Sequence, residues 1–175
     1  MESDNSVILQ TPRLILRAFV IEDVEALASV HGDPEVMRFS VDGVKTREQV
    51  IRFVKNSTDH HQRNGYSQWA VVWKDTGQCI GECGILVQHI GGIGEREISY
   101  RLARSFWGRG IATEAAMACR VHAFETLRVD RVISIVDPQN TASIRVAEKI
   151  GMTREKADVF HGIPVVIYGA KGSAS

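Results

Sequence analysis

The sequence lacks several features that would assign it to a specialised class of protein. Only three of its 175 residues are cysteines, an odd number without the paired CxxC spacing of a zinc or redox site. Basic and acidic residues number 21 each, so no net charge directs the chain to nucleic acid or to an anionic membrane. We therefore expect buried thiols, no metal site and no nucleic-acid partner.

Long hydrophobic runs are also missing. No apolar stretch approaches the roughly 20 residues that cross a bilayer, and the opening MESDNSV is acidic and polar where a secretion signal has a basic end and an apolar stretch. These absences predict a cytoplasmic protein without a membrane partner. The length, with no repeat or linker, predicts a single domain over residues 1–175.

The pattern of apolar residues predicts a mixture of strands and helices. The expected strands are 13–19, 66–74, 79–87, 96–102, 131–136 and two more that meet at His161 and Gly162. The expected helices are 20–31, 46–65, 111–127 and 140–149. A helix between two strands returns the chain to parallel pairing, whereas the earlier strands are joined by hairpin-length loops. The sequence therefore predicts an α/β (α+β) fold, with a mixed sheet of about seven strands and helices on both faces.

The stretch FWGRGIATEA, residues 106–115, places Gly108 and Gly110 directly before a predicted helix. The first turn of a helix has unpaired backbone N–H groups and a partial positive charge, so phosphate oxygens bind there. The glycines leave room for such an approach, and Arg104 and Arg109 add positive charge. A P-loop would need a following lysine, and a dinucleotide site a third glycine at Thr113. From these residues alone, another phosphate site and a plain tight turn are both open.

A longer context carries a resemblance to a known family. EISYRLARSFWGRGIATEA, followed after a strand by NTASIRVAEKIGM, resembles the GNAT acetyltransferases, and TPRLILRAF resembles the branch of the RimJ/RimL-like ribosomal-protein N-terminal acetyltransferases. The resemblance covers residues 11–169. It implies a mostly antiparallel sheet with a splayed central pair of parallel strands, about four flanking helices, and acetyl-CoA as the acyl donor, with coenzyme A as product.

The resemblance also implies which residues contact the cofactor. Its pyrophosphate would bind the loop formed by Trp107, Gly108, Arg109, Gly110, Ile111, Ala112 and Thr113, its pantetheine arm would pair with the strand at Tyr100 and Leu102, and Asn140 would contact it as well. Two positions depart from the family pattern. Ser105 replaces an arginine or glutamine at the start of the loop motif, and Ala147 replaces a tyrosine that is often named as general acid.

The chemistry requires a base, because an amine attacks a thioester only when it is unprotonated. Glu97 matches the position of a catalytic glutamate in several relatives, although it would otherwise be a solvated carboxylate paired with a neighbouring arginine. Glu82 is the second candidate base. A backbone N–H near Tyr100 would bind the oxyanion. Ser143, or a water it holds, would protonate the thiolate, unless it serves only as a residue of a first helical turn.

These residues predict an acetyl-CoA-dependent N-acetyltransferase that acts on the N-terminal α-amine of a protein or peptide by direct attack in a ternary complex. Two alternatives stay open: an acceptor that is a small amine such as a polyamine, amino acid or antibiotic, and an acyl-CoA sensor without activity, suggested by Ala147. The acceptor surfaces are expected at 38–46 and 161–164, and the chain as a monomer or homodimer. We expect Trp69, Trp73 and Trp107 in the core and Glu114 to complement the helix dipole.

Overall fold

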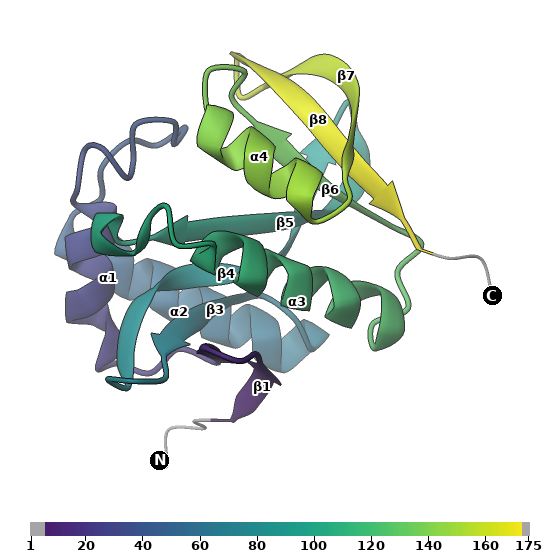
Figure 1. Cartoon of the computed structure of the whole chain (residues 1–175). Helices are drawn as coiled ribbons and strands as arrows, with labels where there is room; N and C mark the ends of the chain where they lie inside the picture. Colours follow the sequence, from purple (N-terminus) through teal and green to yellow (C-terminus); the bar gives the residue numbers. More distant parts are fainter. Residues whose placement is uncertain (1–5, 173–175) are drawn as a thin grey trace.

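The computed structural model describes residues 6–172 and contains one sheet with helices on both faces (Figure 1). Its strands are β1 (Val7–Gln10), β2 (Leu14–Arg17), β3 (Gln68–Trp73), β4 (Gln78–Ile90), β5 (Ile93–Leu102), β6 (Arg131–Val136), β7 (Thr153–Phe160) and β8 (Ile163–Lys171). Its helices are α1 (Asp23–His31), α2 (Arg47–Asn64), α3 (Ile111–Glu125) and α4 (Thr141–Lys149), with a short 3-10 turn at Arg104–Phe106. The opening MESDNSV, in which we expect no secretion signal, lies mostly outside the described residues.

Eight strands are present where the sequence predicts about seven. The additional strand is β1, which has only four residues and is exposed at both of its ends. It pairs with β2 at the edge of the sheet, and a register shift interrupts that pairing. So short a segment lacks the alternation of apolar and polar residues by which strands are recognised in a sequence.

The helix ends follow the local sequence signals. At the start of α2, Thr46 accepts a hydrogen bond from the Gln49 N–H, and the Gln49 side chain accepts one from the Thr46 N–H, which confirms the predicted capping box. Gly65 ends this helix in the left-handed conformation, with φ of 77°. The Asn140 Oδ1 accepts from the Ser143 N–H at 3.1 Å and so caps α4 as expected.

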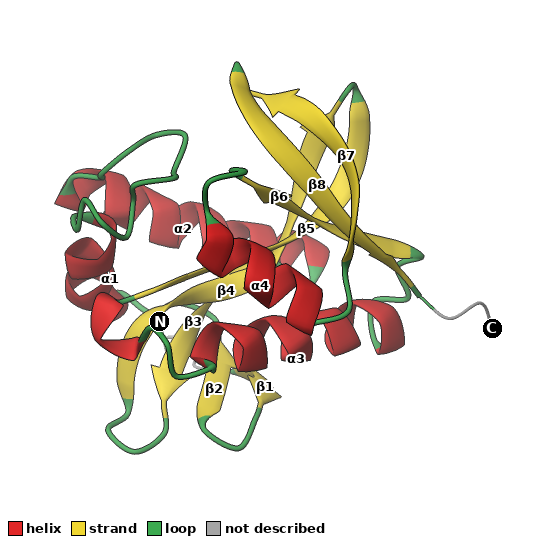
Figure 2. Ribbon diagram, turned by 45° about the horizontal axis from the view of Figure 1, so that its top comes forward, coloured by secondary structure: helices red, strands yellow, loops and turns green. Residues whose placement is uncertain are grey.

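The sheet has the strand order β1-β2-β3-β4-β5-β6-β8-β7. Neighbouring strands are antiparallel except β5 and β6, which are parallel and share a single paired position, Glu97 with Ile133. Beyond it the two strands separate, and Figure 2 shows β7 and β8 rising away from the half of the sheet that contains β1 to β4. The expected splayed pair of parallel strands is confirmed.

Two apolar layers cover the sheet. Leu27 of α1 belongs to the same cluster as Ala70 of β3 and residues of α2, so α1 and α2 cover one face. Ala115 of α3 belongs to the cluster that contains Ile98 and Leu102 of β5, so α3 covers the opposite face, together with α4. In the part of the chain that the structure describes, no helix is long and apolar enough to cross a membrane.

Candidate active site

β5 and β6 share a single paired position, so the edge of β5 beyond Glu97 has no strand partner among the described residues, and we call the space along this edge the gap. The Ala103 N–H donates to the Ile80 carbonyl at 2.9 Å, so the backbone groups of Ala103 point toward β4. In such a ladder alternate residues direct their backbone groups to opposite sides. The N–H and C=O groups of Ile98, Tyr100 and Leu102 therefore face β6 and the gap.

Side chains of the protein already bind two of these three carbonyls. The Ser134 hydroxyl, which is buried, donates to the Ile98 carbonyl at 3.0 Å. The Trp107 indole N–H donates to the Leu102 carbonyl at 2.9 Å. No side chain of the described residues bonds to the Tyr100 carbonyl. Tyr100 is therefore the position on this edge where a peptide-like amide has both a donor and an acceptor available.

Glu97 lies at the point where the strands separate. It is on the face covered by α1 and α2, because Ile98 and Leu102 point to α3 and successive strand residues alternate. Burial raises the pKa of Glu97 to about 7, against smaller opposing effects of hydrogen bonding by the Gln88 side chain and the Ile135 N–H and of the charge of Arg101. The alternative of a solvated carboxylate is wrong, because the residue is only 9% exposed.

Glu82, the second candidate base, is engaged by two other side chains. Its carboxylate is buried and lies 2.7 Å from the His31 Nε2 and 2.8 Å from the Arg101 Nη1. Burial alone would raise the pKa of Glu82, but the hydrogen bonds and charges of His31 and Arg101 lower it below its usual value. A carboxylate held in this way is a weak base.

Tyr100 and Ser143 meet on the opposite face of the sheet. The Tyr100 hydroxyl lies 2.9 Å from both the Ser143 hydroxyl and the Ser143 carbonyl. Ser143 is the third residue of α4, and its backbone N–H is held by the cap residue Asn140. The gap between β5 and β6 therefore has a carboxyl group on one face and a pair of hydroxyl groups on the other.

The glycine loop has the geometry of an anion site. Gly108 and Gly110 have φ of 70° and 72°, the left-handed region in which glycine is unstrained. A Cβ atom at Gly108 would meet nothing within 4 Å. No side chain among residues 6–172 caps α3, which begins after Gly110, so its first N–H groups remain available to an anion. The residues present therefore fit the pyrophosphate of a coenzyme A.

The arginines and the tryptophan beside the loop are placed differently from the sequence-based expectation. Arg104 pairs with Asp33 at 2.8 Å, so its charge is partly neutralised. The Arg109 guanidinium lies over the rings of Trp73 and Phe106, at 4.9 and 5.2 Å from their centroids. Core packing is confirmed for Trp69 and Trp73 but is wrong for Trp107, which is 48% exposed and donates its indole N–H to the Leu102 carbonyl of β5.

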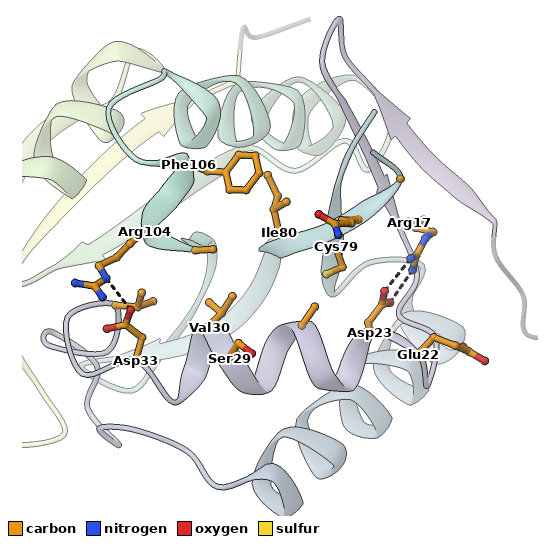
Figure 3. A pocket seen from close by; sticks show the side chains of 15 residues that line it. Arg17, Glu22, Asp23, Ser29, Val30, Asp33, Cys79, Ile80, Arg104 and Phe106 are labelled. Atoms are coloured by element: carbon orange, nitrogen blue, oxygen red, sulfur yellow. Dashed lines mark hydrogen bonds and ion pairs between the residues drawn. The ribbon is translucent and has the colours of Figure 1, made fainter. Parts of the chain in front are cut away.

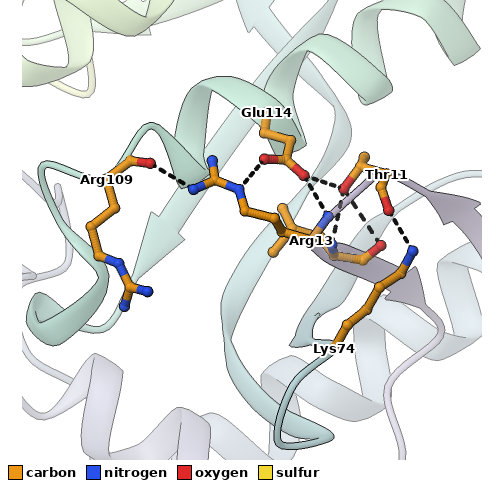
Figure 4. A network of polar contacts seen from close by, with 6 residues as sticks. Thr11, Arg13, Lys74, Arg109 and Glu114 are labelled. Carbon is orange, nitrogen blue, oxygen red and sulfur yellow. Dashed lines mark hydrogen bonds and ion pairs between the residues drawn. The ribbon is translucent and has the colours of Figure 1, made fainter.

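The N-terminal segment holds the first turn of α3 in place (Figure 4). The Glu114 carboxylate accepts hydrogen bonds from the Thr11 hydroxyl at 2.6 Å and from the Arg13 N–H and Nε at 3.0 and 2.6 Å. The Arg13 Nη1 then donates to the Arg109 carbonyl in the loop at 3.0 Å. Glu114 thus has a structural partner beyond the helix dipole, and sequence reasoning gives no signal for it.

Replacement of Glu114 by alanine is expected to lower the free energy of unfolding by about 2 kcal/mol, because three donors lose a charged acceptor. The pKa of Glu114 is lowered by Thr11 and Arg13 although burial opposes them. Its contribution is therefore present above the ordinary pKa near 4.5 and is lost as the pH falls through the lower value in the folded protein. Urea denaturation at pH 7 and pH 3 measures both effects. Glu125→Ala, an exposed position in the same helix, is the control, and equal losses in the two variants would contradict the prediction.

A separate cavity of about 500 Å³ lies between α1 and the start of β4 (Figure 3). Its wall includes the ion pair of Arg104 with Asp33 and that of Arg17 with Asp23. Of the residues that the sequence suggests for catalysis or cofactor binding, only Arg104, which is paired with Asp33, lines this cavity. It is therefore distinct from the gap at Glu97.

None of the three cysteines is exposed. Cys83 and Cys119 are fully buried with their sulfur atoms 3.5 Å apart, and burial raises the pKa of Cys83 well above its usual value. Burial also raises the pKa of the half-buried Cys79 to about 12. All three are free thiols. Among residues 6–172, no cluster of His, Cys, Asp and Glu side chains is placed to hold a metal ion.

The sequence and the fold are similar to those of known proteins. Residues 13–153 match the acetyltransferase (GNAT) domain family. The uncharacterized protein YkkB of Bacillus subtilis is 37% identical over 164 residues, which cover 93% of this chain and 95% of YkkB. The crystal structure of a GNAT-family acetyltransferase from Bacillus anthracis superimposes with a TM-score of 0.81 at 28% identity, covering 93% of this chain and 97% of that one. RimL, a ribosomal L7/L12 α-N-protein acetyltransferase solved with coenzyme A, has the same fold, with a TM-score of 0.80 at 24% identity over 97% of this chain and 100% of RimL.

Proposed function

The chain belongs to the GNAT acetyltransferase family, and on that premise we propose that it transfers an acetyl group from acetyl-CoA to the N-terminal α-amine of a protein or peptide. Glu97 is the base in this proposal. The observation that carries it is a buried carboxyl group with a pKa of about 7 at the point where β5 and β6 separate.

The pKa of Glu97 suits an α-amine better than a lysine. An α-amino group has a pKa of about 8, so its deprotonation costs roughly 1 kcal/mol at pH 7, whereas a lysine with a pKa of about 10.4 costs nearly 5 kcal/mol. A base with a pKa of about 7 lies within about one unit of the first acceptor and more than three units below the second. The match supports an α-amine acceptor.

In this proposal the acceptor amine attacks acetyl-CoA directly, without an acylated enzyme. Acetyl-CoA supplies an acetyl group bound to sulfur. The amine nitrogen forms a bond to the acetyl carbon, and the carbon–sulfur bond breaks with its electron pair on sulfur. One proton of the amine goes to Glu97, and the thiolate takes a proton from water; the proton on Glu97 then neutralises the hydroxide, which leaves an amide, the thiol of coenzyme A and the carboxylate of Glu97. An acyl-cysteine intermediate would need a thiolate, and the raised pKa values of Cys79 and Cys83 disfavour it.

Three parts of the chain would hold acetyl-CoA. The first N–H groups of α3, at Ile111, Ala112 and Thr113, would bind the pyrophosphate beside Gly108 and Gly110. Tyr100 would pair with an amide of the pantetheine arm through its N–H and C=O, whereas Leu102 offers only its N–H, because Trp107 occupies its carbonyl. Asn140 would use its side-chain N–H₂ group, since its oxygen caps α4.

An acceptor screen tests the proposal. Release of thiol from acetyl-CoA is measured with peptides of different N-terminal residues, with the same peptides blocked at the N-terminus but carrying a lysine, and with polyamines, amino acids and aminoglycosides. We expect turnover with free N-terminal peptides and none with the blocked ones, as RimL acts on an α-amine of a ribosomal protein. Turnover with small amines alone would replace the proposed acceptor, and no turnover with any amine would overturn the proposed activity.

A further inference from the structure

We propose that Tyr100 is a positioning residue that directs the Ser143 hydroxyl toward the departing sulfur of the acyl donor. The inference rests on the proposed function and adds a residue to it. Tyr100 would thus contribute its side chain to one step and its backbone to another, with the two groups on different sides of the strand.

The geometry places a single phenol against two oxygen atoms of the same residue. The Tyr100 hydroxyl is 2.9 Å from the Ser143 carbonyl and 2.9 Å from the Ser143 hydroxyl. Ser143 has little freedom, because it is in the first turn of α4 and Asn140 holds its backbone N–H. The two hydroxyl groups connect β5 to α4 on the side of the gap opposite Glu97.

Two arrangements of the hydrogen atoms are compatible with these distances. In the first, Tyr100 donates to the Ser143 carbonyl and accepts from the Ser143 hydroxyl, so both hydrogens are used within the protein. In the second, Tyr100 donates to the hydroxyl oxygen of Ser143, and the hydroxyl hydrogen of Ser143 is free to point into the gap. A sulfur atom that gains negative charge favours the second arrangement, because it provides an acceptor for that hydrogen.

The phenol remains protonated throughout. Burial raises the pKa of Tyr100 well above its usual value. When the carbon–sulfur bond breaks, its electron pair stays on sulfur, Ser143 donates a hydrogen bond to that sulfur, and the thiolate takes its proton from water. Tyr100 and Ser143 keep their protons, so neither needs to be regenerated.

The position of Ala147 explains why such a pair is needed. Ala147 stands where many relatives have a tyrosine, and it is fully buried in the apolar cluster beneath α4. It has no donor to offer. Ser143 is one turn earlier on the same helix and pairs with Tyr100 of β5, so the donor reaches the gap from β5 and the start of α4.

A double-mutant cycle tests whether Tyr100 acts through Ser143. We expect Ser143→Ala to lower kcat about 30-fold and Tyr100→Phe about tenfold, and the double variant to be no slower than Ser143→Ala alone. Tyr66→Phe, at a half-buried tyrosine outside the site, is the control and should keep full activity. Effects of the two substitutions that multiply, or a fully active Tyr100→Phe, would overturn the inference while leaving the acetyltransferase activity intact.

A binding measurement gives a second readout that a purely structural role would not change. The ultraviolet absorbance of the thiolate, followed as a function of pH, gives the thiol pKa of coenzyme A bound to each variant. We expect that pKa to be about one unit higher in both Tyr100→Phe and Ser143→Ala than in the unaltered protein. An unchanged thiol pKa would overturn the inference. If the unaltered protein does not bind coenzyme A, both the inference about Tyr100 and the proposed function fail. Thermal melting of each variant separates these outcomes from a loss of folding.

Discussion

Replacement of Glu97 by glutamine is expected to lower kcat about 1,000-fold, the size of effect that loss of a general base produces. Glutamine keeps the shape of the side chain but cannot accept the proton of the amine. The affinity for acetyl-CoA, measured by calorimetry, should change by less than about twofold, because the change affects the chemical step. Glu125→Gln, at an exposed glutamate of α3, is the matched control. A variant with more than a tenth of the normal kcat would remove Glu97 from the mechanism.

The pH dependence of the same variant is equally informative. Glu97 acts as a base only when ionised, so kcat of the unaltered enzyme should fall about tenfold per pH unit below about 7. In Glu97→Gln this limb should disappear. Rates at saturating acetyl-CoA and acceptor between pH 5 and 9 provide the comparison, and a limb that persists in the variant would assign the pKa to another group.

Stability gives an independent check of that pKa. A carboxyl group whose pKa rises on folding, here from 4.5 to about 7, binds its proton more tightly in the folded state. The free energy of unfolding should therefore decrease as the pH rises from about 4.5 to 7, by up to about 3 kcal/mol from this group. We expect Glu97→Gln to be more stable than the unaltered protein at pH 8 and equally stable at pH 4. The reverse order in urea denaturation would contradict the assignment.

Replacement of Gly108 by aspartate is expected to weaken coenzyme A binding about 100-fold. The position is open, since an added Cβ meets nothing within 4 Å, and its φ of 70° is one that aspartate and asparagine tolerate better than most residues. The new carboxylate would repel the pyrophosphate at close range. Calorimetry with coenzyme A, at low and high salt, measures the loss.

Gly108→Asn is the matched control, because asparagine has the same shape and no charge. We expect it to weaken binding by less than about tenfold, and the difference between the two variants to shrink as salt screens the repulsion. Equal affinities for Gly108→Asp and Gly108→Asn would show that no anion binds beside the loop. The phosphate assignment would then fail even if the enzyme were active.

The features that were predictable from the sequence depend on neighbouring residues. The cap of α2 at Thr46 with Gln49 and the cap of α4 at Asn140 involve residues three positions apart, so a single sequence contains the whole signal. The order of the strands and helices was predictable for the same reason, because each element is recognised from the pattern of its own neighbouring residues. The edge strand β1 is an exception, because its four residues do not alternate between apolar and polar side chains.

The features that were not predictable connect distant parts of the chain. Thr11 and Glu114 are 103 positions apart, and no local pattern joins them. The burial of Glu97 depends on its place beside β6, which follows more than 30 residues later. The position of Glu97 was therefore available from the family resemblance, whereas its raised pKa required the folded chain. The prediction of core packing fails for Trp107, which is 48% exposed, and its hydrogen bond to Leu102 across the loop is a contact that no local pattern announces.

The side chains that bind the carbonyls of Ile98 and Leu102 also limit how another polypeptide could pair with the open edge of β5. An unpaired strand edge is a template on which an unfolded chain or a swapped strand from a second molecule can add, and such addition needs several consecutive rungs. Ser134 and Trp107 block the carbonyls on both sides of Tyr100. The backbone groups of Tyr100 that remain unpaired can bind a single amide but are too few to pair with a strand. The open edge of β5 is therefore a poor template for aggregation.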